Sequence, residues 1–150
     1  MFIDTSLSKV HGLVGAQFFL TLLAIIPFFG RPSPDTLGIA MLCAGLMFGA
    51  WTLKTNSPEN FNVSPLPKIG ARLCFDGPYR FCRHPMYLSL MLTVVGIVQC
   101  NQSLTNAVAA VLLALVLDFK ARMEETLLQE ESAEYRAYME RSWRFIPLIY

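Results

Sequence analysis

The sequence predicts an all-α integral membrane protein with four transmembrane helices, including a helix hairpin, and a C-terminal amphipathic helix at the cytoplasmic face. Three observations lead to this fold class. Of the 150 residues, 54% are hydrophobic and only 15% are charged, whereas soluble domains average about 25% charged. Long stretches of the chain carry no charge. If these stretches cross a membrane, nearly all Lys and Arg residues lie on the same side of it. We therefore expect one membrane domain over residues 1–150.

The composition argues against other classes of protein. High hydrophobicity excludes a disordered chain. A net charge of +1 leaves no excess of basic residues for phosphates, which argues against a nucleic-acid partner. The cysteines form no C-x-x-C pair and have no His at zinc-ligand spacing, so we expect free thiols and no metal site. These cysteines are Cys43, Cys74, Cys82 and Cys100.

Charge-free stretches locate the first two spans, at about 12–30 and 36–53. Each is close to the 20 or so residues that a helix needs to cross a bilayer. The second span contains Gly45 and Gly49 at small-xxx-small spacing, which permits close packing against a neighbouring helix.

The third charge-free stretch, 84–117, is too long for one span. A polar cluster at Asn101-Gln102-Ser103 divides it. We therefore expect two antiparallel helices, about 85–100 and 104–119, joined by a tight turn.

The orientation follows from the basic residues. With four spans, 11 of the 12 Lys and Arg residues fall on one side and only Arg31 on the other. By the positive-inside rule both termini are then cytoplasmic. We expect a multi-pass protein of the plasma membrane, which is the inner membrane if the protein is bacterial.

Two cytoplasmic segments contain most of the polar chemistry: a loop at 54–84 and a C-terminal helix at 120–142. Gly77-Pro78 marks a tight turn in the loop, and His84-Pro85 starts the third span. The amide groups at such a helix start can bind a polar or anionic ligand.

Ionisable residues from both segments should lie close together at membrane depth. They stand next to the third and fourth spans, at the ends of these antiparallel helices that face the same side. Arg83-His84 precede the third span, and Lys120, Glu124 and Glu125 follow the fourth. Such residues are costly in a membrane unless they are paired or functional. An Arg–Glu pair could be purely structural, but the nearby His and Tyr residues favour a polar pocket.

These residues resemble the signature of the isoprenylcysteine carboxyl methyltransferase family. That family belongs to a superfamily of integral membrane enzymes with phospholipid N-methyltransferases and, more distantly, sterol reductases. The resemblance covers about 73–147, half of the chain. It rests on four motifs: Gly77-Pro78-Tyr79-Arg80-x-x-Arg83-His84-Pro85-Met86-Tyr87, Glu124-Glu125-x-x-Leu128, Tyr135-x-x-Tyr138 and Ile146-Pro147.

The resemblance implies S-adenosylmethionine as cofactor and a site at the cytoplasmic face. It assigns cofactor binding to Leu73, Tyr79, His84, Pro85, Met86, Tyr87 and Glu124. We expect Arg83 and Glu125 to be catalytic, and Lys120 or Arg122 to bind the substrate. Two places depart from the family pattern: Lys120 replaces an Arg, and Glu131-Ser132 replace Phe-Gly.

The sequence therefore favours a membrane methyltransferase that acts on a lipophilic or amphiphilic acceptor, with carboxyl methylation most like the family. We expect a lipid or lipophilic substrate, contact with membrane lipids and no obligate protein partner. The accepting group could be a carboxylate, an amine or a thiol. Two alternatives stay open: a nicotinamide-dependent membrane reductase, or a non-catalytic membrane protein with the same fold.

Overall fold

The computed structural model describes residues 2–27, 32–56, 64, 73–147 and 149. Within these residues every helix or strand element is a helix and no β-strand is present, which confirms the predicted all-α class. Its elements are α1 (Phe2–Ile25), α2 (Thr36–Thr55), the short 3-10 helix η2 (Gly77–Arg80), α3 (Pro85–Asn101), α4 (Leu104–Glu131) and α5 (Ala133–Met139). Much of the predicted 54–84 loop, namely 57–63 and 65–72, lies outside the described residues.

Two helices, α2 and α4, are long and apolar enough to cross a membrane. The apolar part of α1, Val10–Ile25, and α3 are shorter. Large apolar side chains point outward along the bundle, such as Met47 (73% exposed) and Leu115 (62% exposed). This surface suits lipid better than water. Crossing of the membrane by all four helices stays a prediction.

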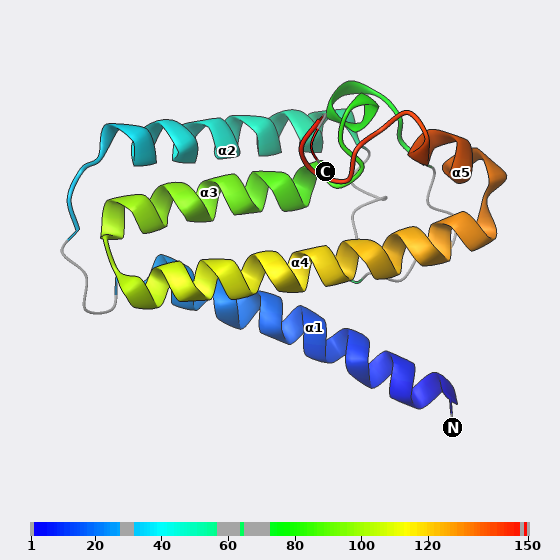
Figure 1. The fold of residues 1–150 in the computed structure, drawn as a ribbon, viewed down its shortest axis with the longest axis horizontal. Coiled ribbons are helices and arrows are strands. Elements are labelled where there is room, and N and C mark those ends of the chain that lie inside the picture. The colour runs from blue at the N-terminus through cyan, green and yellow to red at the C-terminus, as the bar shows by residue number, and fades with distance from the viewer. Residues whose placement is uncertain (1, 28–31, 57–63, 65–72, 148, 150) are drawn as a thin grey trace.

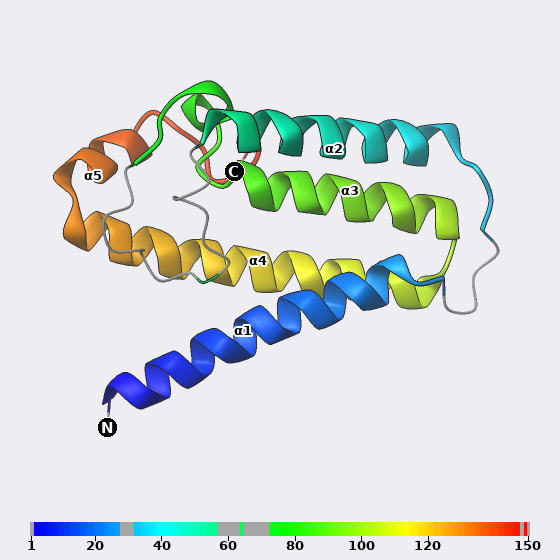
Figure 2. The same ribbon diagram turned by 180° about the vertical axis from the view of Figure 1, so that it is seen from behind.

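The four long helices run alternately in opposite directions (Figures 1 and 2). The end of α2, the start of α3 and the end of α4 therefore lie toward one end of the bundle, with α5 and the C-terminal segment, while the start of α1 points the same way but splays away from them. We call this the site end, and the opposite end the distal end. Every Lys and Arg side chain that the structure describes lies in the half of the molecule toward the site end.

Helices α2 and α3 pack with their backbones in close approach, as the spacing of Gly45 and Gly49 predicts. A Cβ atom added to Gly45 would lie 2.6 Å from the backbone nitrogen of Thr93. The hydroxyl of Ser89 donates a hydrogen bond of 2.8 Å to the Gly45 carbonyl. Small residues therefore fix this helix pair.

Helix α1 packs against α4, and polar side chains cap it at the distal end. The side-chain amide of Asn106 donates to the carbonyls of Leu23, Ala24 and Ile26 at 2.8, 3.1 and 2.6 Å. Asn101 donates to the Ile25 carbonyl at 3.1 Å. These bonds satisfy carbonyls that the last turn of a helix leaves without partners. We call Asn101, Ser103 and Asn106 the distal cap.

The hairpin turn lies where the sequence predicts it. Gln102 adopts a left-handed conformation (φ 48°), and the Ser103 side chain caps the start of α4. Helix α4 then continues beyond the predicted end of the fourth span at 119, as far as Glu131. The expected helix at 120–142 is thus the end of α4 followed by α5. Ser132, in extended conformation, separates the two, and its side chain accepts a bond from the Tyr135 amide.

Candidate functional site

The loop before α3 is shaped by a glycine and then held by the C-terminal segment. Gly77 has φ 55°, and an added Cβ atom would lie 2.6 Å from the Thr55 hydroxyl oxygen, so the tight turn requires glycine. Beyond the turn, Cys82 pairs with Trp143 in a parallel bridge. The Arg83 amide donates to the Trp143 carbonyl at 2.8 Å. Residues far apart in sequence are thus fixed side by side.

Glu125 is the centre of a buried charged cluster that this pairing assembles. Its Oε1 accepts from Arg83 Nε at 2.7 Å and lies 3.2 Å from His84 Nε2. Its Oε2 accepts from Arg144 Nη2 at 2.7 Å and Nε at 3.0 Å. Only 3% of the Glu125 side chain and 10% of the Arg83 side chain are exposed. A buried carboxylate needs such partners, since an unpaired one would be strongly destabilising.

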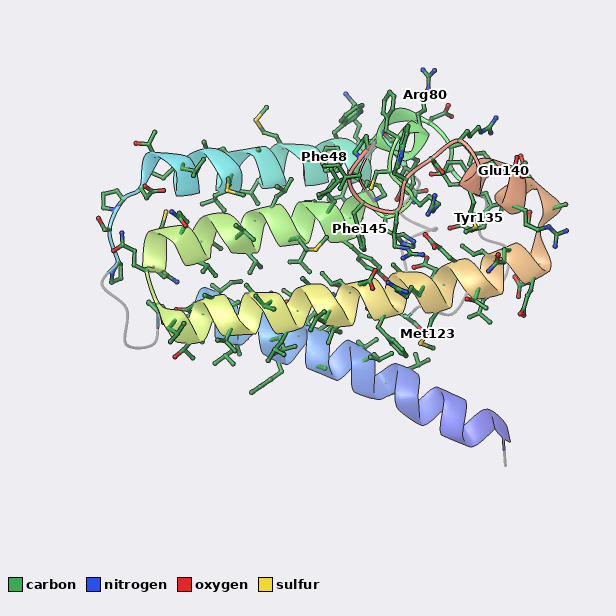
Figure 3. All side chains as sticks on the ribbon, viewed as in Figure 1. Phe48, Arg80, Met123, Tyr135, Glu140 and Phe145 are labelled. Carbon is green, nitrogen blue, oxygen red and sulfur yellow. The ribbon has the colours of Figure 1, made fainter. Side chains whose placement is uncertain are left out.

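Arg83 also ties the cluster to the turn after α5. Its Nη1 donates to the carbonyls of Met139, at 3.3 Å, and Ser142. Figure 3 shows Tyr135 of α5 and Phe145 of the C-terminal segment at the same end of the bundle as Arg80. The Phe145 ring lies 6.0 Å from the His84 ring, between centroids. The cluster is therefore covered by the C-terminal segment.

Glu124 differs from its neighbour in exposure. Its side chain is 32% exposed, and its Oε2 lies 3.6 Å from His84 Nδ1. The Tyr87 hydroxyl donates to the same oxygen at 3.4 Å. The Tyr87 and His84 rings are stacked, with centroids 5.4 Å apart. Glu124 is thus a carboxylate that protein groups hold in place on one side while part of it stays accessible.

The structure separates the two basic residues expected to bind substrate. Lys120 is fully buried, and its ammonium donates to the side-chain oxygen of Gln17 on α1. The same nitrogen lies 5.4 Å from the centroid of the Tyr87 ring. Arg122 is 58% exposed and pairs with Asp118 at 2.8 Å, one turn earlier on α4. Lys120 therefore adjoins the cluster, whereas Arg122 lies on an exposed face of the helix.

Tyr79 connects η2 to α2 and α5. Its hydroxyl accepts a bond of 3.1 Å from the Asn56 amide, and its carbonyl accepts one of 2.5 Å from the Tyr138 hydroxyl. Burial raises the pKa of Tyr79 to about 12 and also raises the pKa of Tyr138. Both phenols are therefore protonated at neutral pH and can donate hydrogen bonds.

The other residues expected to bind the cofactor lie around the same helix start. Pro85 is buried as the first residue of α3, and Met86 is half-buried beside it. Leu73 is half-buried before η2.

Cys82 is a buried and unreactive thiol next to the cluster. It is 1% exposed and donates to the Arg144 carbonyl at 3.3 Å. Burial raises its pKa to about 12, so little nucleophilic thiolate exists at neutral pH. In the part of the chain that the structure describes, no three His, Cys, Asp or Glu side chains are grouped as metal ligands.

Sequence reasoning missed two members of the site, Arg144 and Gln17. Arg144 stands between the aromatic residues Trp143 and Phe145, outside the motifs that the sequence analysis identified. Gln17 is an amide within the first charge-free stretch. A polar residue at membrane depth is a signal that could have identified it.

Comparisons with known proteins place this site in a family context. The sequence pattern of a family described as phospholipid methyltransferase matches residues 34–134 of the 150. The matched region includes α2, η2, α3 and α4, and with them Arg83, His84, Glu124 and Glu125. Arg144 and Gln17 lie outside it.

Individual relatives are similar over parts of the chain. The nickel-cobalt-cadmium resistance protein NccN of Alcaligenes xylosoxydans xylosoxydans is 35% identical over 78 residues, which are 51% of this chain and 37% of that protein. The cobalt-zinc-cadmium resistance protein CzcN of Cupriavidus metallidurans is 34% identical over 78 residues, 51% of this chain and 36% of that protein. The uncharacterized protein YpbQ of Bacillus subtilis is 28% identical over 119 residues, 78% of this chain and 71% of YpbQ. The chain thus spans little more than a third of the two resistance proteins.

Proposed function

The chain belongs to the phospholipid methyltransferase family, and from this premise we propose that it transfers the methyl group of S-adenosylmethionine to an amphiphilic acceptor at the cytoplasmic face of a membrane. The observation that carries the proposal is the contrast between two adjacent carboxylates. Glu125 is buried with both oxygens bonded, whereas Glu124 is held beside it with 32% of its side chain exposed. A fully paired carboxylate next to an accessible one suits a site built to receive a cationic ligand.

The residues at this site fit the proposed cofactor. S-adenosylmethionine supplies a methyl group activated on a cationic sulfonium, and it also carries an ammonium and a carboxylate. The Glu124 carboxylate and the rings of Tyr87 and Tyr79 are groups that bind cations. The first amides of α3, at Met86 and Tyr87, have no acceptor within their own helix and suit a carboxylate.

The buried cluster would act by holding Glu124 and Tyr87 in place. His84 contacts Glu125 through one ring nitrogen and Glu124 through the other. Preorganised groups spare the reaction the cost of reorienting them. Arg83 and Glu125, expected from sequence to be catalytic, are already bonded to each other. We therefore propose that they are positioning residues, which act on the ligand through His84.

The proposal also includes a membrane topology with four spans and both termini in the cytoplasm. The basic side chains of the described residues support it, because all lie toward the site end. The acceptor would then reach the site from the bilayer with its reacting group at the interface. Lys120 is a cation beside Tyr87 and would hold an anionic group of that acceptor. Carboxyl methylation is the reaction that the sequence resemblance favours.

Calorimetric titration of the purified protein with S-adenosylhomocysteine tests this function. We expect Glu124→Gln to weaken binding about tenfold to a hundredfold, because a hydrogen bond to a charged group contributes roughly 1.5–3 kcal/mol. Glu130→Gln, which changes an exposed carboxylate on the same helix, should bind like the wild type. Equal losses in the two variants, or wild-type binding of NADPH but not of S-adenosylhomocysteine, would contradict the proposal.

A further inference from the structure

Tyr135 is a buried tyrosine at the site end whose hydroxyl has no protein partner. The residue is only 4% exposed, and in the part of the chain that the structure describes its hydroxyl makes no hydrogen bond. The hydroxyls of the other described tyrosines, Tyr79, Tyr87 and Tyr138, are each bonded to a protein group. Buried polar groups normally have a partner, so the Tyr135 hydroxyl requires a separate explanation.

Packing holds Tyr135 in place without help from its hydroxyl. Its amide donates to the Ser132 side chain at 3.2 Å, at the start of α5. Its ring meets the Tyr138 ring edge-on, with centroids 5.7 Å apart. At the end of α5, the Met139 carbonyl accepts a bond of 3.3 Å from Arg83 of the charged cluster. Figure 3 shows Tyr135 between α5 and the end of α4. The fold therefore fixes the ring and leaves the hydroxyl available.

The Tyr135 hydroxyl is also accessible. Among the described residues, Oδ1 of Asn106 at the distal cap is the only side-chain oxygen or nitrogen that is sealed from solvent without a partner. The Tyr135 hydroxyl lacks a partner as well but is not sealed in this way. It therefore borders space that a small polar group can enter.

The charges around Tyr135 determine which kind of group suits that space. Burial, followed by the charges of Glu125 and Glu124, raises the pKa of Tyr135, and the charge of Arg83 opposes this shift. The phenol therefore keeps its proton at neutral pH. Because the carboxylates attract that proton, the lone pairs of the hydroxyl oxygen are left for a donor on the open side. Glu125 has both oxygens bonded, whereas Glu124 is 32% exposed. The accessible groups are thus two acceptors, which suit an ammonium with its several N–H donors.

We propose that Tyr135 is a ligand-binding residue of this site, whose hydroxyl oxygen accepts a hydrogen bond from the ammonium in the amino-acid part of the S-adenosyl ligand, beside Glu124. The inference rests on the proposed function and adds a residue to that same site. The family pattern ends at residue 134, so Tyr135 lies just outside the matched region. Helix α5 then takes part in selecting ligands that carry an amino-acid group.

Calorimetric titration of the purified full-length protein with two ligands tests this role. S-adenosylhomocysteine carries the amino-acid part, whereas methylthioadenosine has the same adenosine and thioether without it. Tyr135→Phe removes the hydroxyl and keeps the ring. We expect this variant to bind S-adenosylhomocysteine about tenfold more weakly, because it loses a hydrogen bond to a charged group. Its affinity for methylthioadenosine should equal that of the wild type. Its stability in a sodium dodecyl sulfate titration should not fall, since the hydroxyl has no protein partner to lose.

Tyr138→Phe is the matched control, because it makes the same change at a hydroxyl that binds the Tyr79 carbonyl. This variant should lose stability, and any change in its affinity should be by the same factor for both ligands. Equal losses for the two ligands in Tyr135→Phe would overturn the role of Tyr135, as would unchanged binding of S-adenosylhomocysteine or a fall in stability as large as that of Tyr138→Phe. A wild type that binds neither ligand would contradict the proposed function itself, and the role of Tyr135 with it.

Discussion

Both ends of the helix bundle bury polar side chains, but they do so in different ways. At the distal cap, neutral amides donate to backbone carbonyls at the end of α1 and just beyond it, and Asn106 is fully buried. At the site end, charged side chains from the loop before α3, from α4 and from the C-terminal segment bind one another around Glu125. The distal cap binds backbone carbonyls through neutral side chains, whereas the site end is centred on ion pairs between side chains.

The difference shows which polar groups the fold itself needs. The end of a helix leaves carbonyls to be satisfied, and an amide does this at little electrostatic cost. Buried charges carry a desolvation penalty that an apolar core would avoid. The distal cap is therefore explained by folding alone. The charged cluster is not, and the ligand-binding role that we propose would supply a reason for it.

The largest expected effect is that of Glu125→Gln. This change removes the charge that pairs Arg83 and Arg144 and leaves two guanidinium groups, only 10% and 17% exposed, without their buried counter-ion. We expect the free energy of unfolding to fall by about 3–5 kcal/mol. Binding of S-adenosylhomocysteine should be lost as well. The free energy can be measured by titrating mixed micelles with sodium dodecyl sulfate.

The exposed Glu131 provides the control for that variant. Glu131→Gln removes a charge from the same helix and should leave both unfolding and binding unchanged. If Glu125→Gln were as stable as Glu131→Gln, the charged cluster would contribute no more to the fold than a surface residue, and the contrast between the two ends would fail.

A smaller effect is expected from Asn106→Ala at the distal cap. Two carbonyls of α1 and that of Ile26, just beyond its end, lose their donor, so we expect a loss of about 1–3 kcal/mol in the free energy of unfolding. Affinity for S-adenosylhomocysteine should stay at the wild-type value, because the change is at the opposite end of the bundle. Thr105→Ala, at an exposed neighbouring position, is the matched control for stability. A drop in affinity as large as that of Glu125→Gln would show that the ends are not independent.

The effect confined to the narrowest conditions concerns Cys82 and appears only in alkaline solution. Its pKa is raised by burial from 9.0 to about 12 in the folded protein. Between these values the unfolded chain releases the thiol proton while the folded chain keeps it. Stability is therefore unaffected below pH 9 and falls as the pH rises toward 12, by at most about 1.4 kcal/mol per pH unit.

Unfolding of wild type and Cys82→Ala, compared at several values above pH 9, checks this expectation. The variant should lose less stability with rising pH than the wild type. Cys43→Ala, at an exposed thiol, should follow the wild type. Identical slopes for Cys82→Ala and wild type would show that the buried thiol titrates as it does in the unfolded chain.

Much of the fold could be predicted from the sequence because its signals are local. The hairpin turn at Asn101-Gln102-Ser103 and the start of α3 at Pro85 lie where the sequence predicted them. Gly45 and Gly49 marked the close contact of α2 with α3. The end of α4 was not predicted, because a charged segment continues the helix until Ser132 adopts an extended conformation and caps α5.

The site was predictable only as far as its motifs reach. Arg83, His84, Glu124 and Glu125 carry a recognisable pattern, and the structure brings these residues together. Arg144 joins them through the pairing of Cys82 with Trp143, a contact between distant segments that leaves no periodicity in the sequence. Gln17 approaches Lys120 only because α1 packs against α4. The places of Arg144 and Gln17 in the site therefore depend on tertiary contacts, which the sequence pattern does not reveal.

The bridge between Cys82 and Trp143 also has a consequence for the order of biosynthesis. A ribosome makes the chain from its N-terminus, so α3 and most of α4 are complete before Trp143 and Arg144 are translated. Until then Glu125 lacks the guanidinium that binds its Oε2, and the Arg83 amide lacks its carbonyl partner. The charged site is therefore completed only after all four long helices have been synthesised, and the segment with Trp143 and Arg144 closes it.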